Sequence, residues 1–224
     1  MINETLVFTH LKQQNNTYWT VKKTILATLS VVMVFMASCR RDPGFELTPE
    51  IEFENIFFET SIVAGVGGGP PEATDQFVIF LRFQDGDGDL GFTQADLTDP
   101  KFESISDTTL IDLDNDGIFD DTTTSPRNFN ATLFRKNQGI YEEVETTIPL
   151  GGSFQPLIST DELGPIEGTL RHNFTTGNRA SFFANTTVEP DDTVRFEVFI
   201  IDRELNRSNT IVTSDVVIPA VSDN

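Results

Sequence analysis

The stretch DGDGDLG at 85 to 91 places three aspartates on alternate positions, directly after an apolar segment. Calcium is a hard cation that takes about six to eight oxygen ligands, and alternate aspartates on a tight loop can converge their carboxylates on one point. The intervening glycines let the backbone curl. Asp85, Asp87 and Asp89 are therefore predicted to hold a calcium ion. The alternative is a turn whose aspartates bond only to nearby backbone.

A second acidic stretch, DLDNDGIFDD at 112 to 121, follows the spacing of calcium-binding loops more closely. Aspartates occupy its first, third, fifth and ninth positions and glycine its sixth: Asp112, Asp114, Asp116, Asp120 and Gly117. The twelfth position is Thr123 instead of glutamate, so the stretch resembles the shorter DxDxDGxxD calcium loops of dockerins and thrombospondin type 3 repeats. The first stretch has Leu90 at its sixth position and Asp96 at its twelfth.

Charge supports a cation site over nucleic-acid binding. The chain has 35 acidic and 15 basic residues, a net charge of −20, and 12 of the acids lie between positions 85 and 121 against one base, Lys101. Such a surface repels phosphate backbones. Aspartates this close together repel one another unless a cation lies among them. Magnesium is a weaker candidate, because it keeps its waters and seldom uses an all-carboxylate cage.

Residues 1 to 38 have the features of a secretory leader. Two lysines precede an apolar stretch, 25 to 36, which continues into MASC. About twelve apolar residues are too few to span a bilayer as a helix, which takes about 20. The small residues before Cys39, the one cysteine of the chain, resemble the lipobox of bacterial lipoproteins. We expect a cleaved signal peptide, a lipidated Cys39 that anchors the protein in a bilayer, and a tether over 39 to 50. An ordinary secretory peptide is the alternative.

The rest of the chain is expected to form one domain over 51 to 219, with a short tail over 220 to 224. Apolar residues alternate at 77 to 83 and at 194 to 200, the period of a strand with one face toward a core. Other expected strands are 51 to 58, 131 to 136, 140 to 148, 166 to 174 and 210 to 218. With no sustained helical period, these segments predict an all-β fold, an antiparallel sandwich of about seven to eight strands with an acidic insertion at 85 to 125.

Four motifs give the chain a family resemblance. They are FQDGDGDLG at 83 to 91, NQGIYEEV at 137 to 144, PIEGTL at 165 to 170 and PDDTVRFEVFIIDRELNRSNTI at 190 to 211. Together they are similar to uncharacterised Gram-negative lipoproteins with an immunoglobulin-like sandwich. The resemblance implies that fold and an outer-membrane, lipid-anchored address, but no activity. It also matches a turn before the last strand, formed by Asp202, Arg203, Asn206, Ser208 and Asn209.

Topology predicts where the two matched loops meet. In an immunoglobulin-like sandwich, the loop after the second strand and the loop before the last strand lie at the same pole. Asp202 is therefore expected to approach Asp85, Asp87 and Asp89 and to share their ion. Arg203 is the alternative, as a salt-bridge partner of one of these aspartates.

Catalysis is not expected. Beyond the leader the chain has one histidine, His172, and its one thiol is assigned to the lipid. A catalytic nucleophile–base pair of the Ser-His or Cys-His kind would therefore depend on that single imidazole. His172 is expected on the surface or at the edge of a strand. We expect a structural or interaction lipoprotein that meets another envelope protein. The alternative is a glycan-binding module with an aromatic platform drawn from Phe92, Phe102, Phe119, Tyr141, Phe154, Phe182 and Phe183.

Overall fold

The computed structural model describes residues 44–64, 69, 71–111, 121–146, 150–160 and 163–220. All of them belong to one compact unit, Pro43–Asn224. The expected leader, Cys39, and the aspartates of the second acidic stretch lie outside the described residues: Asp112, Asp114, Asp116 and Asp120.

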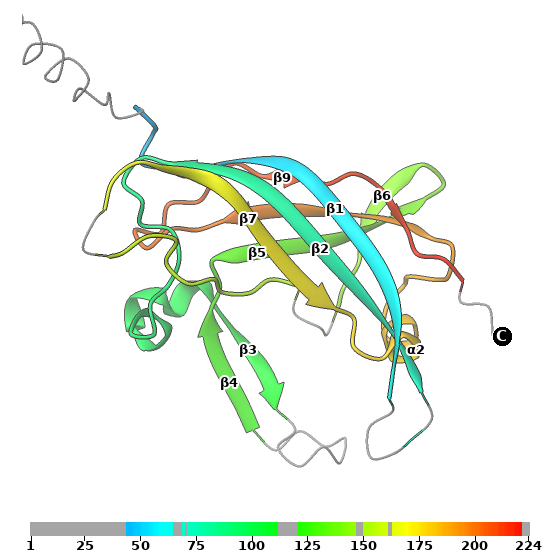
Figure 1. Ribbon diagram of the computed structural model, residues 1–224. Helices are drawn as coiled ribbons and strands as arrows, with labels where there is room; N and C mark the ends of the chain where they lie inside the picture. The colour runs from blue at the N-terminus through cyan, green and yellow to red at the C-terminus, as the bar shows by residue number, and fades with distance from the viewer. Residues whose placement is uncertain are drawn as a thin grey trace, which may run out of the picture. The chain divides into compact units, whose positions relative to one another are not determined.

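The first sheet has β2 (Glu72–Asp85) at its centre, between β1 (Glu50–Val63) and β7 (Ile166–Thr175), and both pairings are antiparallel. The three strands run side by side in Figure 1. The alternating residues of β2 turn inward, since Phe77, Ile79, Leu81 and Phe83 are at most 7% exposed. The next inward position on this face is Asp85, the last residue of the strand. The expected strand is confirmed, and its alternation points a carboxylate into the protein.

The second sheet has β8 (Thr193–Ile200) at its centre, with β5 (Phe129–Asn137) on one side and β6 (Ile140–Glu143) beyond β5. Two short strands, β9 (Ile211–Val212) and β10 (Val216–Val217), pair with the other edge of β8. Between them, the Thr213 hydroxyl accepts a hydrogen bond from the Phe196 amide at 3.0 Å, in place of a strand carbonyl. The strand expected at 210 to 218 is therefore split in two.

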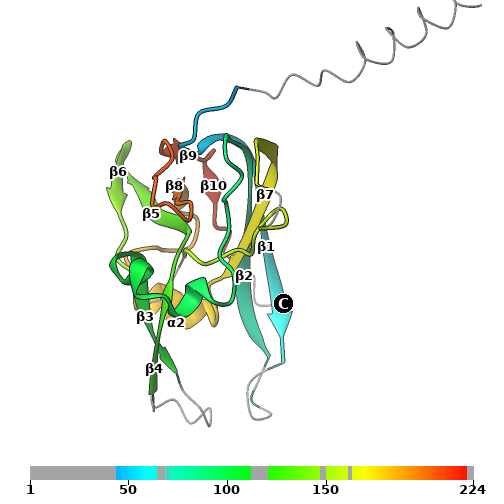
Figure 2. The same cartoon turned by 90° about the vertical axis from the view of Figure 1, so that its left-hand side faces the viewer.

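The two sheets form separate layers in Figure 2, with β1, β2 and β7 on one side and β5 and β6 on the other. Orders β1-β2-β7 and β6-β5-β8-β9/β10 are those of an immunoglobulin-like sandwich. Its core contains the packed rings of Phe77, Phe174 and Phe196, with centroids 5.1 to 5.3 Å apart. The predicted all-β antiparallel sandwich of about seven to eight strands is confirmed, since the described residues form sheets of three and five strands.

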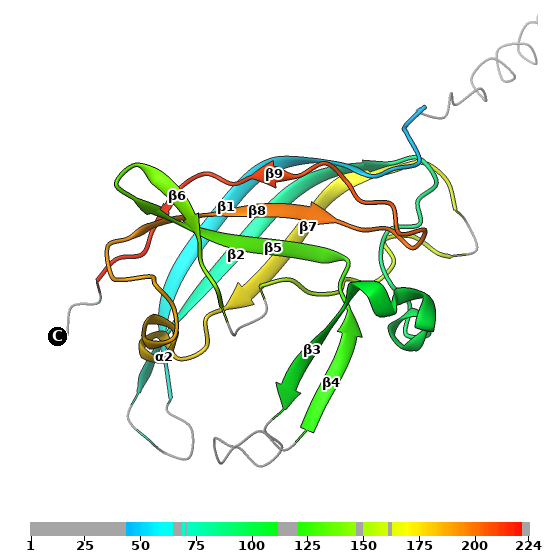
Figure 3. The same ribbon diagram turned by 180° about the vertical axis from the view of Figure 1, so that it is seen from behind.

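The additional strands lie in the long connection between β2 and β5. It contains two short 3-10 helices, η2 (Asp96–Thr98) and η3 (Pro100–Ile105), and a hairpin of β3 (Ser106–Ile111) and β4 (Asp121–Pro126). The hairpin forms a separate two-stranded sheet (Figure 3). A small apolar contact holds the connection together, because Phe92 and Phe102 are each 2% exposed with ring centroids 4.7 Å apart.

Candidate metal site

Three carboxylates meet where β2 ends. Asp85, Asp87 and Asp89 each offer a carboxylate oxygen within 4.8 Å of the other two. Asp85 is fully buried because it occupies an inward position of β2, and Asp89 is 5% exposed. This acidic triad has the oxygen chemistry and the spacing to hold a metal ion.

The buried oxygens of the triad have no hydrogen-bond partner. Both carboxylate oxygens of Asp85 and Oδ1 of Asp89 are inaccessible to solvent and unpaired. An ionised carboxylate buried in this way is strongly unfavourable, so such groups are normally paired, protonated or bound to a metal. The geometry therefore requires a cation or protons at this position.

A fourth carboxylate comes from the turn after β8. Asp202 is fully buried, and its charge raises the pKa of both Asp85 and Asp89. Asn206 fixes this carboxylate, because its backbone N–H donates to Oδ1 at 2.8 Å and its Nδ2 donates to Oδ2 at 2.9 Å. The structure thus brings Asp202 to the triad, at the shared pole that the topology suggested.

Arg203 makes a different contact from the expected salt bridge. Its Nε donates to the backbone carbonyl of Asp89 at 2.9 Å. Among the described residues, the ion pairs do not include one between Arg203 and these aspartates. The guanidinium still lowers the pKa of Asp89 through its charge. Arg203 therefore fixes the loop backbone and leaves the Asp89 carboxylate available to a ligand.

Burial and mutual repulsion make these carboxylates weak acids in the ion-free protein. Burial, followed by the charges of Asp87, Asp89 and Asp202, raises the pKa of Asp85 to about 7. Burial and Asp202 raise the pKa of Asp89 to about 6. The pKa of Asp202 is also raised, mainly by burial. Near neutral pH the site therefore binds protons unless a metal ion takes their place.

Backbone carbonyls from a segment distant in the sequence pack closely against the acidic loop at Gly88 and Gly91. Gly88 and Gly91 have φ angles of 73° and 94°, a region that side chains other than glycine rarely adopt. A Cβ at Gly88 would collide with the carbonyl of Gly164, and one at Gly91 would collide with the carbonyl of Gln155. The loop therefore requires glycine at both positions, for its curl and for the close approach of Gln155 and Gly164.

Asp96, at the twelfth position of the first loop, has other partners. Its Oδ2 accepts hydrogen bonds from the backbone N–H of Thr93 at 2.7 Å and from the Thr93 hydroxyl at 2.8 Å. This is a local turn that leads into η2. The first loop thus contributes three aspartates and not its twelfth residue, unlike a full calcium loop.

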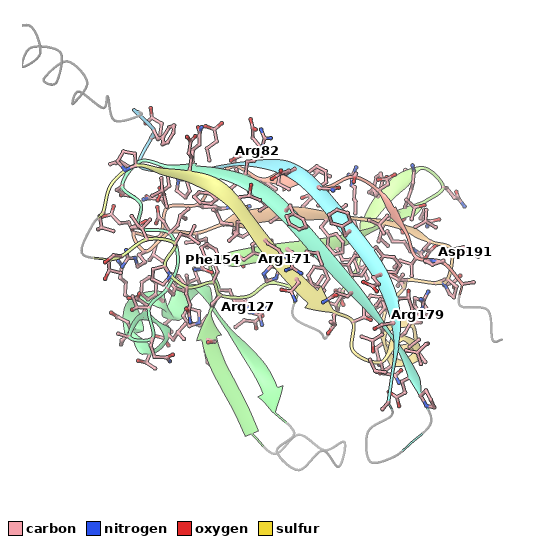
Figure 4. All side chains as sticks on the ribbon, viewed as in Figure 1. Arg82, Arg127, Phe154, Arg171, Arg179 and Asp191 are labelled. Atoms are coloured by element: carbon pink, nitrogen blue, oxygen red, sulfur yellow. The ribbon has the colours of Figure 1, made fainter. Side chains whose placement is uncertain are left out.

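A second buried charged group, which the sequence did not reveal, connects β1, β2 and α2 (Arg179–Ala184). Asp75 is fully buried, and Arg179 Nη1 contacts its Oδ1 at 2.9 Å. The hydroxyl of Thr60 donates to the same oxygen at 2.6 Å, and Arg179 also donates to the carbonyl of Pro219. Figure 4 labels Arg179, the first residue of α2, beside β1 and β2. This cluster joins the first sheet to the C-terminal segment.

His172 lies on the edge strand β7, as expected, but its ring turns inward. The imidazole stacks on Phe129 with centroids 3.9 Å apart, and Nε2 lies 3.3 Å from the carbonyl of Leu150. Burial lowers its pKa. The expectation of a surface position was therefore wrong, because the inward face of β7 continues from Leu170 through His172 to Phe174.

The aromatic residues considered for a glycan platform are mostly engaged inside the protein. Phe92, Phe102 and Phe182 are 2 to 3% exposed. The hydroxyl of Tyr141 donates to Asp215, and the guanidinium of Arg195 lies 3.4 Å from the centre of its ring. Phe154 and Phe183 are half-buried against the core, and Phe119 lies outside the described residues.

Comparisons of the chain with protein-family models, with curated proteins and with solved structures each gave no match. Within the described part of the chain, no helix has the length and apolar character that a membrane span requires. The fold and the acidic site are therefore the basis for a functional assignment.

Proposed function

We propose that this chain is a calcium-stabilised β-sandwich of the bacterial cell envelope, anchored as a lipoprotein through Cys39 and with a structural or protein-interaction role. The observation that carries the calcium assignment is the set of buried, unpaired carboxylate oxygens on Asp85 and Asp89. A folded protein rarely leaves such atoms without a partner.

Calcium fits the donor set better than other partners do. The cluster offers only oxygens: three carboxylates lie within coordinating distance of one another, and the charge of a fourth, Asp202, acts on Asp85 and Asp89. Calcium accepts about six to eight such ligands in flexible geometries, whereas magnesium requires a near-octahedral shell and usually keeps several waters. A divalent ion would also offset the burial and the repulsion that together raise the pKa of Asp85 to about 7. Asp112, Asp114, Asp116 and Asp120 supply a second proposed site.

The envelope assignment is supported by sequence alone. The apolar leader that continues into MASC and the single cysteine support lipidation at Cys39. We favour a structural or interaction role over a glycan-binding one, because the candidate platform residues are engaged in the interior or in side-chain contacts. The single imidazole beyond the leader packs on Phe129 and supports a non-enzymatic role.

Thermal unfolding of the purified protein tests the calcium assignment. Binding to the folded state adds RT ln(1 + [L]/Kd), about 2.7 kcal/mol when free calcium is a hundredfold above Kd. The midpoint should fall on chelation and recover with calcium, but much less with magnesium. Replacing Asp87 and Asp89 by Asn should remove most of the response of the first site, and the same change at Asp114 and Asp116 should remove that of the second. A midpoint indifferent to chelator would show that both loops are ordinary turns.

A further inference from the structure

The segment that precedes β1, residues 44 to 49, is in backbone contact with the acidic loop. The N–H of Gly86 donates to the carbonyl of Glu46 at 2.8 Å. A Cβ at Gly86 would lie 2.5 Å from the carbonyl oxygen of Phe45 and 2.6 Å from that of Glu46. Only glycine therefore permits this approach, and the contact depends on the backbone position of one loop residue.

Gly86 lies between two members of the acidic triad. Asp85 is held by the ladder that pairs it with Ile166 of β7, but Asp87 lies beyond the strand, on the loop. Because their carboxylate oxygens lie within 4.8 Å of one another, Asp85, Asp87 and Asp89 repel one another when ionised unless a cation lies between them, and this repulsion favours opening of the loop. A bound cation reverses that force and fixes the curl between Asp85 and Asp89. The direction of the Gly86 N–H follows from the same curl.

We propose that calcium binding by the acidic loop docks the 44–49 segment on Gly86 and that release of the ion frees this segment. The inference rests on the proposed calcium site and adds a consequence for the chain that leads to it. Linkage makes the coupling reciprocal, so docking of the segment raises calcium affinity by the same factor by which calcium favours docking.

This coupling determines how far the sandwich can lie from a lipidated Cys39. An extended chain spans at most about 3.3 to 3.6 Å per residue. From a lipidated Cys39 to a docked Phe45 the chain therefore reaches about 20 Å, whereas from Cys39 to Glu50, where β1 begins, it reaches about 40 Å. Loss of calcium would therefore roughly double the maximum length of free chain between a lipidated Cys39 and the sandwich.

Backbone NMR relaxation of the purified protein, titrated with calcium, measures docking directly. Order parameters are about 0.85 in rigid backbone and below about 0.6 in flexible segments. The amides of Phe45, Glu46 and Leu47 should move from the flexible to the rigid range as calcium saturates. Gly86→Ala should keep them flexible and weaken the calcium Kd from calorimetry by about fivefold or more. Gly44→Ala is the matched control, because a Cβ there meets nothing within 4 Å.

The two measurements separate the inference from the assignment on which it rests. If calorimetry shows calcium binding that replacement of Asp87 and Asp89 by Asn removes, while the order parameters of residues 45 to 47 do not change, the docking inference is wrong and the calcium site stands. If calcium produces neither heat nor ordering, both are wrong. Ordering that persists in Gly86→Ala would also overturn the inference. Should Gly86→Ala fail to fold, the titration of the wild type alone gives the same decision.

Discussion

Replacing Asp85 by Asn should stabilise the calcium-free protein near neutral pH. The native side chain is fully buried with both oxygens unpaired, and its pKa is raised from 3.8 to about 7. A carboxyl whose pKa is higher in the folded than in the unfolded state is stabilising while it is protonated. That contribution is fully present below about pH 3.8 and is lost as the pH rises to about 7. Asn keeps the shape of the protonated group without this loss.

The size of the effect follows from the pKa shift. A shift of about three pH units corresponds to about 4 kcal/mol at about 1.4 kcal/mol per unit. Solvent near the loop screens part of it, which leaves about 2 kcal/mol. Asp85→Asn should therefore melt about 4 to 8 °C above the wild type at about pH 7.5 without calcium. The difference should disappear near pH 4, where both proteins carry a neutral side chain.

Calcium should reverse the sign of this difference in melting temperature between Asp85→Asn and the wild type. With the ion bound, the ionised Asp85 is a ligand, so the variant loses most of the stabilisation that binding provides and melts below the wild type. Circular dichroism melts in metal-stripped buffers, with and without saturating calcium, measure both differences. A wild type that is more stable than Asp85→Asn in metal-free buffer at about pH 7.5, or a difference that does not vary with pH, would refute the reasoning.

Two further predictions concern other parts of the chain. Arg179→Met should destabilise the fold by about 3 to 5 kcal/mol in urea unfolding, because it leaves the buried Asp75 without its ion-pair partner. Lys136→Met is the control: it removes the half-exposed pair with Asp215 and should change the midpoint little. Equal effects of the two substitutions would contradict the burial argument. Cells fed an alkyne fatty acid should label the wild type and not Cys39→Ala, and labelling of the variant would exclude lipidation at this position.

The sandwich was predictable where alternation and turn chemistry were strong. The inward residues of β2 and β8 recur with a period of two, and the KNQG turn joins β5 to β6 through Gln138 and Gly139, both at positive φ. The split of the last strand was not predictable, because the Thr213 hydroxyl replaces a carbonyl only in the folded ladder. The β3–β4 hairpin lacked an apolar alternation that would indicate it.

The acidic triad was predictable from spacing, since alternate aspartates with glycine between them converge on a tight loop. The position of Asp202 followed from strand order. The segments that enclose the loop were not predictable, because Gln155, Gly164 and Glu46 approach it with backbone carbonyls, which carry no sequence signal. The loop pattern placed Asp96 at its twelfth, ion-binding position. In the structure, the Asp96 carboxylate instead accepts hydrogen bonds from the backbone N–H and the hydroxyl of Thr93.

A crystal structure of the protein grown with calcium tests the central claim most directly. Anomalous scattering should place one ion about 2.3 to 2.6 Å from carboxylate oxygens of Asp85, Asp87 and Asp89, with Asp202 beside it, and replacing Asp87 and Asp89 by Asn should abolish that peak. A well-ordered loop with these carboxylates paired to water or to one another, and no anomalous peak at saturating calcium, would contradict the account.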